Sequence, residues 1–120
     1  MLSKIGAFSQ NVITTLNLNI APGTPIYLGQ SNITHMKNQH LKDYLKYGAY
    51  ITDILYNPDY VAINKKDDSI EYVKLFLTNN EYVKVAVRVS TNGVYYARSL
   101  YVLNAKRVQN FITAGTLKPV

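Results

Sequence analysis

Apolar residues recur every three or four positions near the N-terminus, between Leu2 and Leu16. This spacing predicts an amphipathic helix. From Leu16 to Ile20 apolar and polar residues alternate strictly, which is the period of a strand, so a short strand is expected there if the helix ends early. The segment 21–25 holds two prolines and a glycine and ends either element. Residues 26–28 then predict another short strand.

Two helices are predicted next. The first covers residues 33–47, with Ser31 or Asn32 as its N-cap and Gly48 as the residue that stops it. The second is short, covers residues 50–55 and ends before an Asn-Pro-Asp sequence that favours a turn.

The second half of the chain alternates between apolar and polar residues in the manner of strands. We expect four strands, over residues 60–63, 69–77, 81–90 and 94–103. The last two are joined by Asn92-Gly93, the strongest hairpin signal in the chain. A closing helix over 105–113 begins after Asn104 and ends at Gly115. The predicted fold class is α+β, with N-terminal helices packed on a four-stranded antiparallel meander sheet and a closing C-terminal helix.

The turn chosen for Asn92-Gly93 decides which side chains share a face. With a two-residue turn, one face carries alternating valines, namely Val85, Val87 and Val89. Tyr96, Arg98 and Lys74 fall on that same face, which must pack against helices because β-branched residues are costly to leave in water. The opposite face carries Tyr82, Lys84, Ala86, Arg88, Ala97, Ser99 and Tyr101. A bulged turn would instead move Arg98 to the face of Arg88, and the sequence is compatible with both alternatives.

Composition fits a single soluble domain spanning residues 1–120. The chain is 48% hydrophobic, which is enough for one core, and it has no run of about 18 apolar residues that could span a bilayer. Cysteine is absent, which excludes disulfides, thiolate metal sites and cysteine nucleophiles. Residues 1–20 are expected to hold the N-terminal helix and the short strand, and residues 24–120 the core of the domain. A reducing cytoplasm is the default location.

The charge balance favours a polyanionic partner. Thirteen Lys and Arg stand against seven Asp and Glu, a formal charge of +6, and basic side chains bind phosphates by neutralising them and releasing counterions. Eleven tyrosines could stack on unpaired bases, as readers of single-stranded RNA require. The simpler explanation for most of them is a half-buried place in a strand.

Both histidines lie in one short stretch of the second predicted helix. His35 and His40 are five positions apart, so on a regular helix they diverge by about 140° and do not share a ligand easily. We therefore expect no metal site, and without a phosphate-binding glycine motif we expect no cofactor. Either histidine could act as a general acid or base, the alternative being a capping or surface residue. Metal-free RNA cleavage needs only a base, an acid and cations to stabilise the phosphorane.

Several segments together carry a resemblance to a known family: SNITHMKNQHLKDYLKYGAYITDILYNPDYVAI, SIEYVK, EYVKVAVRVS, YYARSLYVLN and FITAGTLKPV. In this order and spacing the chain resembles, over residues 24–120, the phage-borne branch of the Barnase–EndoU–colicin–RelE-like (BECR) nucleases. The resemblance implies helices packed on a four-stranded antiparallel sheet, with the catalytic residues near the sheet. It also implies metal-independent ribonuclease activity, often on tRNA or ribosome-bound RNA, and an origin in a phage or another mobile element.

The resemblance suggests roles for particular residues. The family's helical histidine falls on His35 or His40, the general base, and its late-strand Arg followed by a hydroxyl falls on Arg98-Ser99. Arg98 and Lys74 are expected to clamp the phosphate and Ser99 to donate a hydrogen bond to it. The expected substrate-binding residues are Arg88, Lys84, Tyr96 and Tyr101. The alternatives are a solvated strand face for the lysines and Arg88, and for Arg98 an ion pair with Glu71 or Asp53.

Two functions of different class follow. The first is an endoribonuclease, a toxin or effector, that cleaves RNA (tRNA among the candidates) by 2′-OH attack to a 2′,3′-cyclic phosphate. The second is a non-catalytic module that keeps the nuclease fold and binds RNA or a protein such as an immunity or virion protein. Neither involves a membrane. The expected location is the host cytoplasm, with delivery or association with a virion as the alternative.

Overall fold

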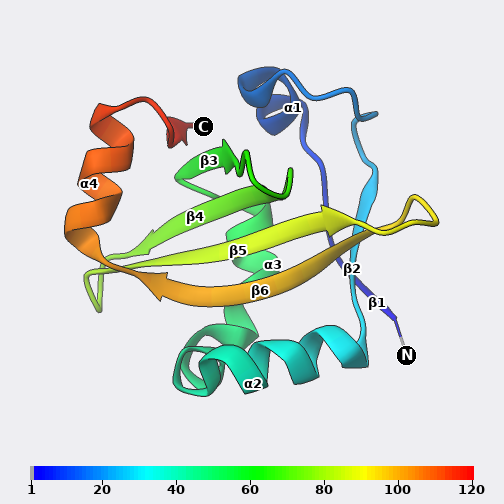
Figure 1. The fold of residues 1–120 in the computed structure, drawn as a ribbon, viewed down its shortest axis with the longest axis horizontal. Coiled ribbons are helices and arrows are strands. Elements are labelled where there is room, and N and C mark those ends of the chain that lie inside the picture. Colours follow the sequence, from blue (N-terminus) through cyan, green and yellow to red (C-terminus); the bar gives the residue numbers. More distant parts are fainter. Residues whose placement is uncertain (1) are drawn as a thin grey trace.

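The computed structural model describes residues 2–120 and contains, over that range, one seven-stranded mixed sheet in the order β1-β2-β6-β5-β4-β3-β7 (Figure 1). The strands are β1 Ser3–Ala7, β2 Pro25–Leu28, β3 Tyr60–Ile63, β4 Ile70–Phe76, β5 Glu81–Val89, β6 Tyr95–Leu103 and β7 Lys118–Pro119. The helices are α1 Gln10–Leu16, α2 Gln30–Tyr47, the 3₁₀ turn η1 Gly48–Tyr50, α3 Ile51–Tyr56 and α4 Ala105–Thr113.

The predicted four-stranded meander is present as β3, β4, β5 and β6, each paired antiparallel with the next. The prediction of four strands is incomplete because the sheet extends at both edges. β2 pairs parallel with the first residues of β6, β1 pairs with β2, and the two-residue β7 pairs with β3. The α+β class is confirmed, and the sheet is mixed.

The single helix predicted between Leu2 and Leu16 is wrong in its first half. Residues 3–7 form β1, where a Cβ on Gly6 would lie 3.0 Å from Leu55, so the strand comes very close to α3. Ser9 then starts α1, because its hydroxyl accepts a hydrogen bond from Val12 N at 3.2 Å. Asn17 ends the helix with a φ of 54°, and the alternating segment up to Ile20 forms no strand.

The side of the sheet that packs on α1, α2 and α3 is called the helix-side face below. Val83, Val85 and Val87 of β5 are fully buried there, as their alternation predicted. Val89, predicted on the same face, is 51% exposed because it lies at the end of the strand. The helix-side face therefore holds the main core.

The opposite side, called the open face below, is covered by a helix only at one end within residues 2–120. There α4 packs on the sheet in a second, smaller cluster that includes the buried Val73, Val108 and Leu117. Asn104 begins α4 as predicted, since its side chain accepts hydrogen bonds from the N–H groups of Lys106 and Arg107. In Figure 1, α4 lies to one side in front of the sheet, while α3 lies behind it. The rest of this face is free to carry polar residues.

The β5–β6 hairpin has a three-residue loop, not the predicted two-residue turn. Ser90 N donates to Val94 O at 2.8 Å, and Gly93 has a φ of +81°, as a type I turn closed by a left-handed glycine requires. This loop shifts the pairing by one residue at the hairpin end. A bulge then restores the predicted register, in which Val85 faces Leu100.

The bulge leaves Arg98 without a partner on β5. Ala86 pairs with Ser99 and the next residue, Val87, pairs with Ala97, so Arg98 is the extra residue. Ala97 therefore lies on the helix-side face, where it is buried in the core, and Tyr96 lies on the open face. The two-residue turn predicted the reverse for both residues. The hairpin loop is thus the bulged alternative, but Arg98 itself lies in the strand bulge and pairs with no residue of β5.

The β4–β5 turn is also longer than predicted. Phe76 pairs with Glu81, which leaves four residues in the loop instead of two. Because this change moves the register by two positions, every side chain keeps its predicted face. Lys74 and Phe76 accordingly lie on the helix-side face.

α2 runs beside the edge of β6 that β2 leaves free. β2 pairs only with Tyr95 and Tyr96, and further along β6 the Asp43 carboxylate accepts a hydrogen bond from Val102 N at 3.0 Å. α2 starts earlier than predicted, with Gly29 as N-cap and Asn32 accepting a hydrogen bond from Gly29 N at 2.8 Å. In residues 2–120, no helix is long and apolar enough to cross a membrane.

Candidate functional site

A pocket of about 490 Å³ opens where α2 begins beside the start of β6. It is lined by Leu2, Gly29, Ser31, Asn32, His35, Ser90, Tyr96 and Arg98. None of these side chains is a carboxylate, whereas one is a guanidinium and one an imidazole. The pocket therefore combines cationic and hydrogen-bonding groups in a form suited to an anion.

The first turn of α2 contributes to this pocket in two ways. Ser31 and His35 are four residues apart and so lie on one face of the helix, which is why both line the same pocket. The N-terminus of α2 also lies there, and its first turn contains no acidic residue. Backbone N–H groups and the helix dipole make such an end favourable for a negative group.

Arg98 reaches the pocket from the β6 bulge. Bulges redirect side chains, and Arg98 is exposed while the flanking Ala97 is fully buried. Arg98 forms no salt bridge with any residue from 2 to 120, so the alternative of an ion pair with Glu71 or Asp53 is wrong. Its positive charge remains available to a ligand.

His40 lies in a different environment from His35. Its backbone is non-helical (φ −147°, ψ 65°), which kinks α2. The His40 ring stacks on Tyr101 with ring centroids 4.7 Å apart and an interplanar angle of 27°. The Lys84 ammonium lies 4.6 Å from the centre of the same Tyr101 ring. Only one of the two predicted histidines therefore shares a pocket with Arg98.

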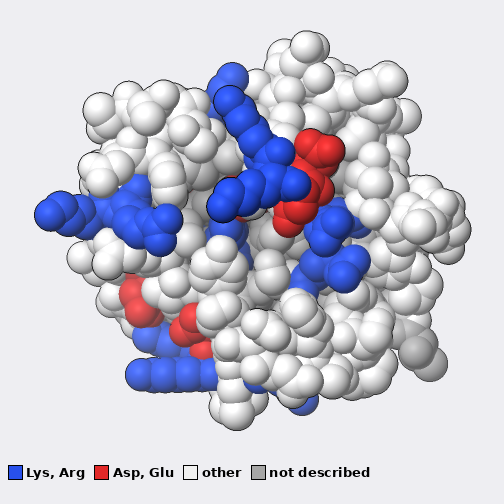
Figure 2. Space-filling model, in the orientation of Figure 1, with Lys and Arg blue, Asp and Glu red and all other residues white. Residues whose placement is uncertain are grey.

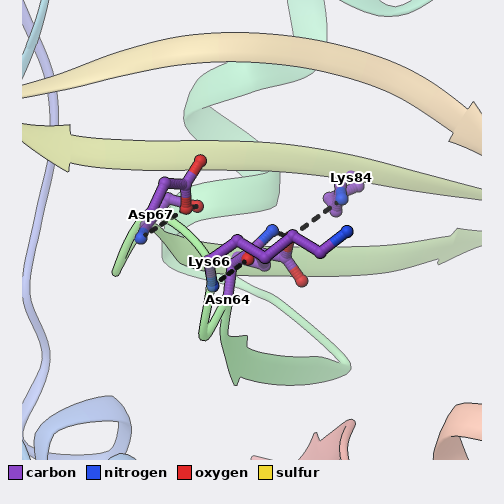
Figure 3. A network of polar contacts seen from close by, with 6 residues as sticks. Asn64, Lys66, Asp67 and Lys84 are labelled. Atoms are coloured by element: carbon purple, nitrogen blue, oxygen red, sulfur yellow. Dashed lines mark hydrogen bonds and ion pairs between the residues drawn. The ribbon is translucent and has the colours of Figure 1, made fainter.

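Lys84 also anchors a polar network on the open face. Its ammonium is 2.9 Å from the Glu71 carboxylate, which accepts a second hydrogen bond from Asn64 at 3.3 Å. Figure 3 shows Lys84 of β5 reaching toward the turn that carries Asn64 and Lys66. Burial acts to lower the pKa of Lys84, but hydrogen bonds to Tyr101 and Glu71 and the Glu71 charge outweigh it, so this pKa is raised.

Three other predicted site residues lie apart from the pocket lining. Arg88 is exposed and pairs across the hairpin with Tyr96, and Ser99 is half-buried opposite Ala86. Lys74 lies on the other side of the sheet, where its ammonium donates to Asn57 O at 2.8 Å. The structure thus does not bring Lys74 together with the other cations.

Basic side chains are gathered on the open face. Figure 2 shows Lys and Arg atoms around the β3–β4 turn and the neighbouring part of β5 and β6, next to a group of acidic atoms, with further basic groups over α4 and α2. Across residues 2–120, no three His, Asp or Glu side chains come together in a way that could hold a metal ion.

Sequence reasoning missed Ser31, Ser90 and Glu71 as site residues. Ser31 was considered only as an N-cap, yet its spacing from His35 could have indicated a shared helix face. Ser90 Oγ donates to Val94 O at 3.0 Å and so also supports the hairpin loop. Glu71 was considered only as a partner for Arg98, and its pairing with Lys84 depends on the β4–β5 register.

Comparison with known proteins gives one result. The profile of a family described as phage-Barnase-EndoU-ColicinE5/D-RelE like nuclease matches residues 3–110. Neither the curated proteins nor the solved structures gave a significant match to the chain. Because the family match covers most of the chain, including α2 and the whole β3–β6 meander, the chain belongs to the phage Barnase–EndoU–ColicinE5/D–RelE-like nuclease family.

Proposed function

We propose that the chain is a metal-independent endoribonuclease that cleaves RNA by attack of a 2′-OH on the adjacent phosphate. The observation that carries the proposal is the pocket in which His35, Tyr96 and Arg98 meet the N-terminus of α2 without a carboxylate. A negative phosphate would enter this pocket without meeting a fixed negative charge. Membership of a phage-associated nuclease family supports the same reaction class.

In the proposed reaction, the scissile phosphate binds between the Arg98 guanidinium and the first turn of α2. His35 takes the proton of the 2′-OH as the O2′–P bond forms, and the P–O5′ bond breaks as O5′ receives a proton from the Tyr96 hydroxyl. The products are a 2′,3′-cyclic phosphate and a 5′-OH end. Arg98 and the helix N–H groups stabilise the charge of the phosphorane.

The other predicted residues have supporting roles in this proposal. Arg88 adds positive charge to the open face along the path of the RNA, and Ser99 is a hydrogen-bond donor beside Arg98. Lys84 is paired with Glu71 and supports the open face instead of contacting RNA directly. His40 is assigned to the Tyr101 stack and not to the proton transfer. Lys74 has no role in it, since its ammonium is engaged on the helix-side face.

The test is incubation of the purified protein with total RNA and with tRNA in EDTA, followed by analysis of the ends. We expect cleavage that leaves 2′,3′-cyclic phosphates. His35→Gln and Arg98→Ala should each lower the rate by about 100-fold or more, whereas Lys106→Ala on α4 serves as the matched surface control and should leave it unchanged.

Two outcomes would contradict the proposal. One is the absence of cleavage of any RNA by folded wild-type protein. If such protein still bound RNA in a salt-dependent way, the non-catalytic binding module would be the better description. The other is loss of activity in His40→Gln with full activity in His35→Gln. That result would assign the general base to His40, which stacks on Tyr101.

A further inference from the structure

A row of cations and tyrosines crosses four strands of the sheet beside the pocket. Lys4 of β1 pairs with Tyr27 of β2, Tyr27 pairs with Tyr96 of β6, and Tyr96 pairs with Arg88 of β5. Paired residues on neighbouring strands project to the same face. At the usual spacing between strands the row is roughly 14 Å long.

The row lies on the open face. Ile26 and Tyr95, which flank Tyr27 and Tyr96 in sequence, both belong to the main core on the helix-side face. Alternation along a strand therefore directs Tyr27 and Tyr96 to the other side. Both tyrosines are half-buried, and Lys4 and Arg88 at the ends of the row are exposed.

Within residues 2–120, the rings of Tyr27 and Tyr96 stack neither on each other nor on any other aromatic ring. The aromatic pairs of residues 2–120 include neither Tyr27 nor Tyr96, although they include six pairs elsewhere in the molecule. In the same range, neither hydroxyl takes part in a hydrogen bond. Two half-exposed rings flanked by two cations form the surface on which unpaired bases stack while their phosphates meet positive charge.

We propose that this row binds the single-stranded RNA that continues from the scissile phosphate across β6, β2 and β1. Tyr96 belongs to both the pocket and the row, so RNA can pass from one to the other without a gap. Bases stack on Tyr96 and Tyr27, and Arg88 and Lys4 contact the backbone. Paired RNA is excluded because its bases are already stacked within the duplex. This inference rests on the proposed function for the identity of the ligand.

Binding is tested with a fluorescently labelled single-stranded RNA oligonucleotide made uncleavable by 2′-O-methyl groups, and with the duplex of the same sequence. Wild-type protein should bind the single strand more tightly than the duplex. Tyr27→Ala should weaken single-strand binding by about 5- to 150-fold, and Tyr27→Phe should retain it. The control is Tyr56→Ala, because Tyr56 is 54% exposed at the end of α3 and lies outside the row.

Lys4→Glu provides a second variant that does not disturb packing, since Lys4 is exposed. It should weaken binding and reduce the salt dependence of the affinity. The inference is overturned if folded Tyr27→Ala and Lys4→Glu both bind the single strand as wild type does, or if the duplex binds equally well.

A cleavage experiment separates this inference from the proposed function. On a dinucleotide substrate, Tyr27→Ala should match wild type, whereas on long single-stranded RNA its KM should rise at little cost in kcat. If single-stranded RNA binds in a way that depends on Tyr27 but no RNA is cleaved, the proposed function is contradicted and the inference is supported. If long RNA is cleaved and Tyr27→Ala leaves its KM and kcat unchanged, the proposed function is supported and the inference is contradicted.

Discussion

The two faces of β5 differ in residue type and in what covers them. Val83, Val85 and Val87 are fully buried under helices, whereas Lys84 and Arg88, which alternate with them, are half-buried and exposed on the open face. Because neighbouring side chains in a strand point to opposite sides, one nine-residue strand supplies both the core and the charged surface. Substitutions on the helix-side face should therefore lower stability by removing packing. Substitutions on the open face should act by breaking ion pairs or by changing activity.

The largest effect on stability is expected from Val85→Ala. This substitution leaves a cavity beside Tyr72 and Leu100, its fully buried neighbours on β4 and β6, and should lower the free energy of unfolding by about 2–3 kcal/mol. Urea unfolding followed by circular dichroism measures it. Val89→Ala is the matched control, because the same residue type on the same strand is 51% exposed there and should change stability by less than about 0.5 kcal/mol. Equal losses in the two variants would show that burial of the valine on the helix-side face does not set the cost.

An intermediate effect is expected from Lys84→Met on the open face. The Lys84–Glu71 pair is mostly buried, with side chains 12% and 14% exposed, so removal of the ammonium leaves a carboxylate short of a partner. We expect a loss of about 1–2 kcal/mol, between the values for exposed and fully buried pairs. The control is Lys46→Met, which breaks the more exposed pair with Glu81 and should cost less. A larger loss for Lys46→Met would contradict the role of burial.

The same pair predicts a pH dependence. Since the pKa of Lys84 is raised above 10.5 in the folded protein, its contribution to stability is complete below pH 10.5 and is lost as the pH rises through the folded-state value. The difference in stability between wild type and Lys84→Met should accordingly be constant near neutrality and shrink in strong alkali.

The elements of this fold that rest on local pattern were predictable. Alternating valines predicted β5, and Asn104 predicted the start of α4. Burial of one strand face and capping of a helix each require particular residue types at neighbouring positions, so both can be recognised in the local sequence. β1 was not predictable in this way. Its apolar residue Ile5 fits the spacing of a helix, and the strand forms because it pairs with β2 and because Gly6 allows close contact with Leu55. Such contacts between distant segments produce no periodic pattern in the local sequence.

The candidate site was predictable by residue type more than by position. The sequence predicts His35, Tyr96 and Arg98 as site residues. Gly93, however, is compatible with turns of two and of three residues, and only the longer turn requires the bulge at Arg98. The separation of His35 from His40 depends on the start and the kink of α2. Strand alternation correctly put Lys74 on the helix-side face, although the resemblance suggested that it clamps the phosphate together with Arg98.

The smallest effect is expected from Tyr72→Phe, and its sign tests how strictly the helix-side face is apolar. Tyr72 is fully buried among Val85, Val61 and Phe8, and within residues 2–120 its hydroxyl has no hydrogen-bond partner, while burial raises its pKa. Removing an unsatisfied buried hydroxyl relieves a desolvation cost, so we expect stability to stay equal or to rise by up to about 1 kcal/mol. Urea unfolding at neutral pH measures the change. A loss of more than about 1 kcal/mol would mean that the hydroxyl is satisfied in solution, and the helix-side face would then share the polar character that here distinguishes the open face.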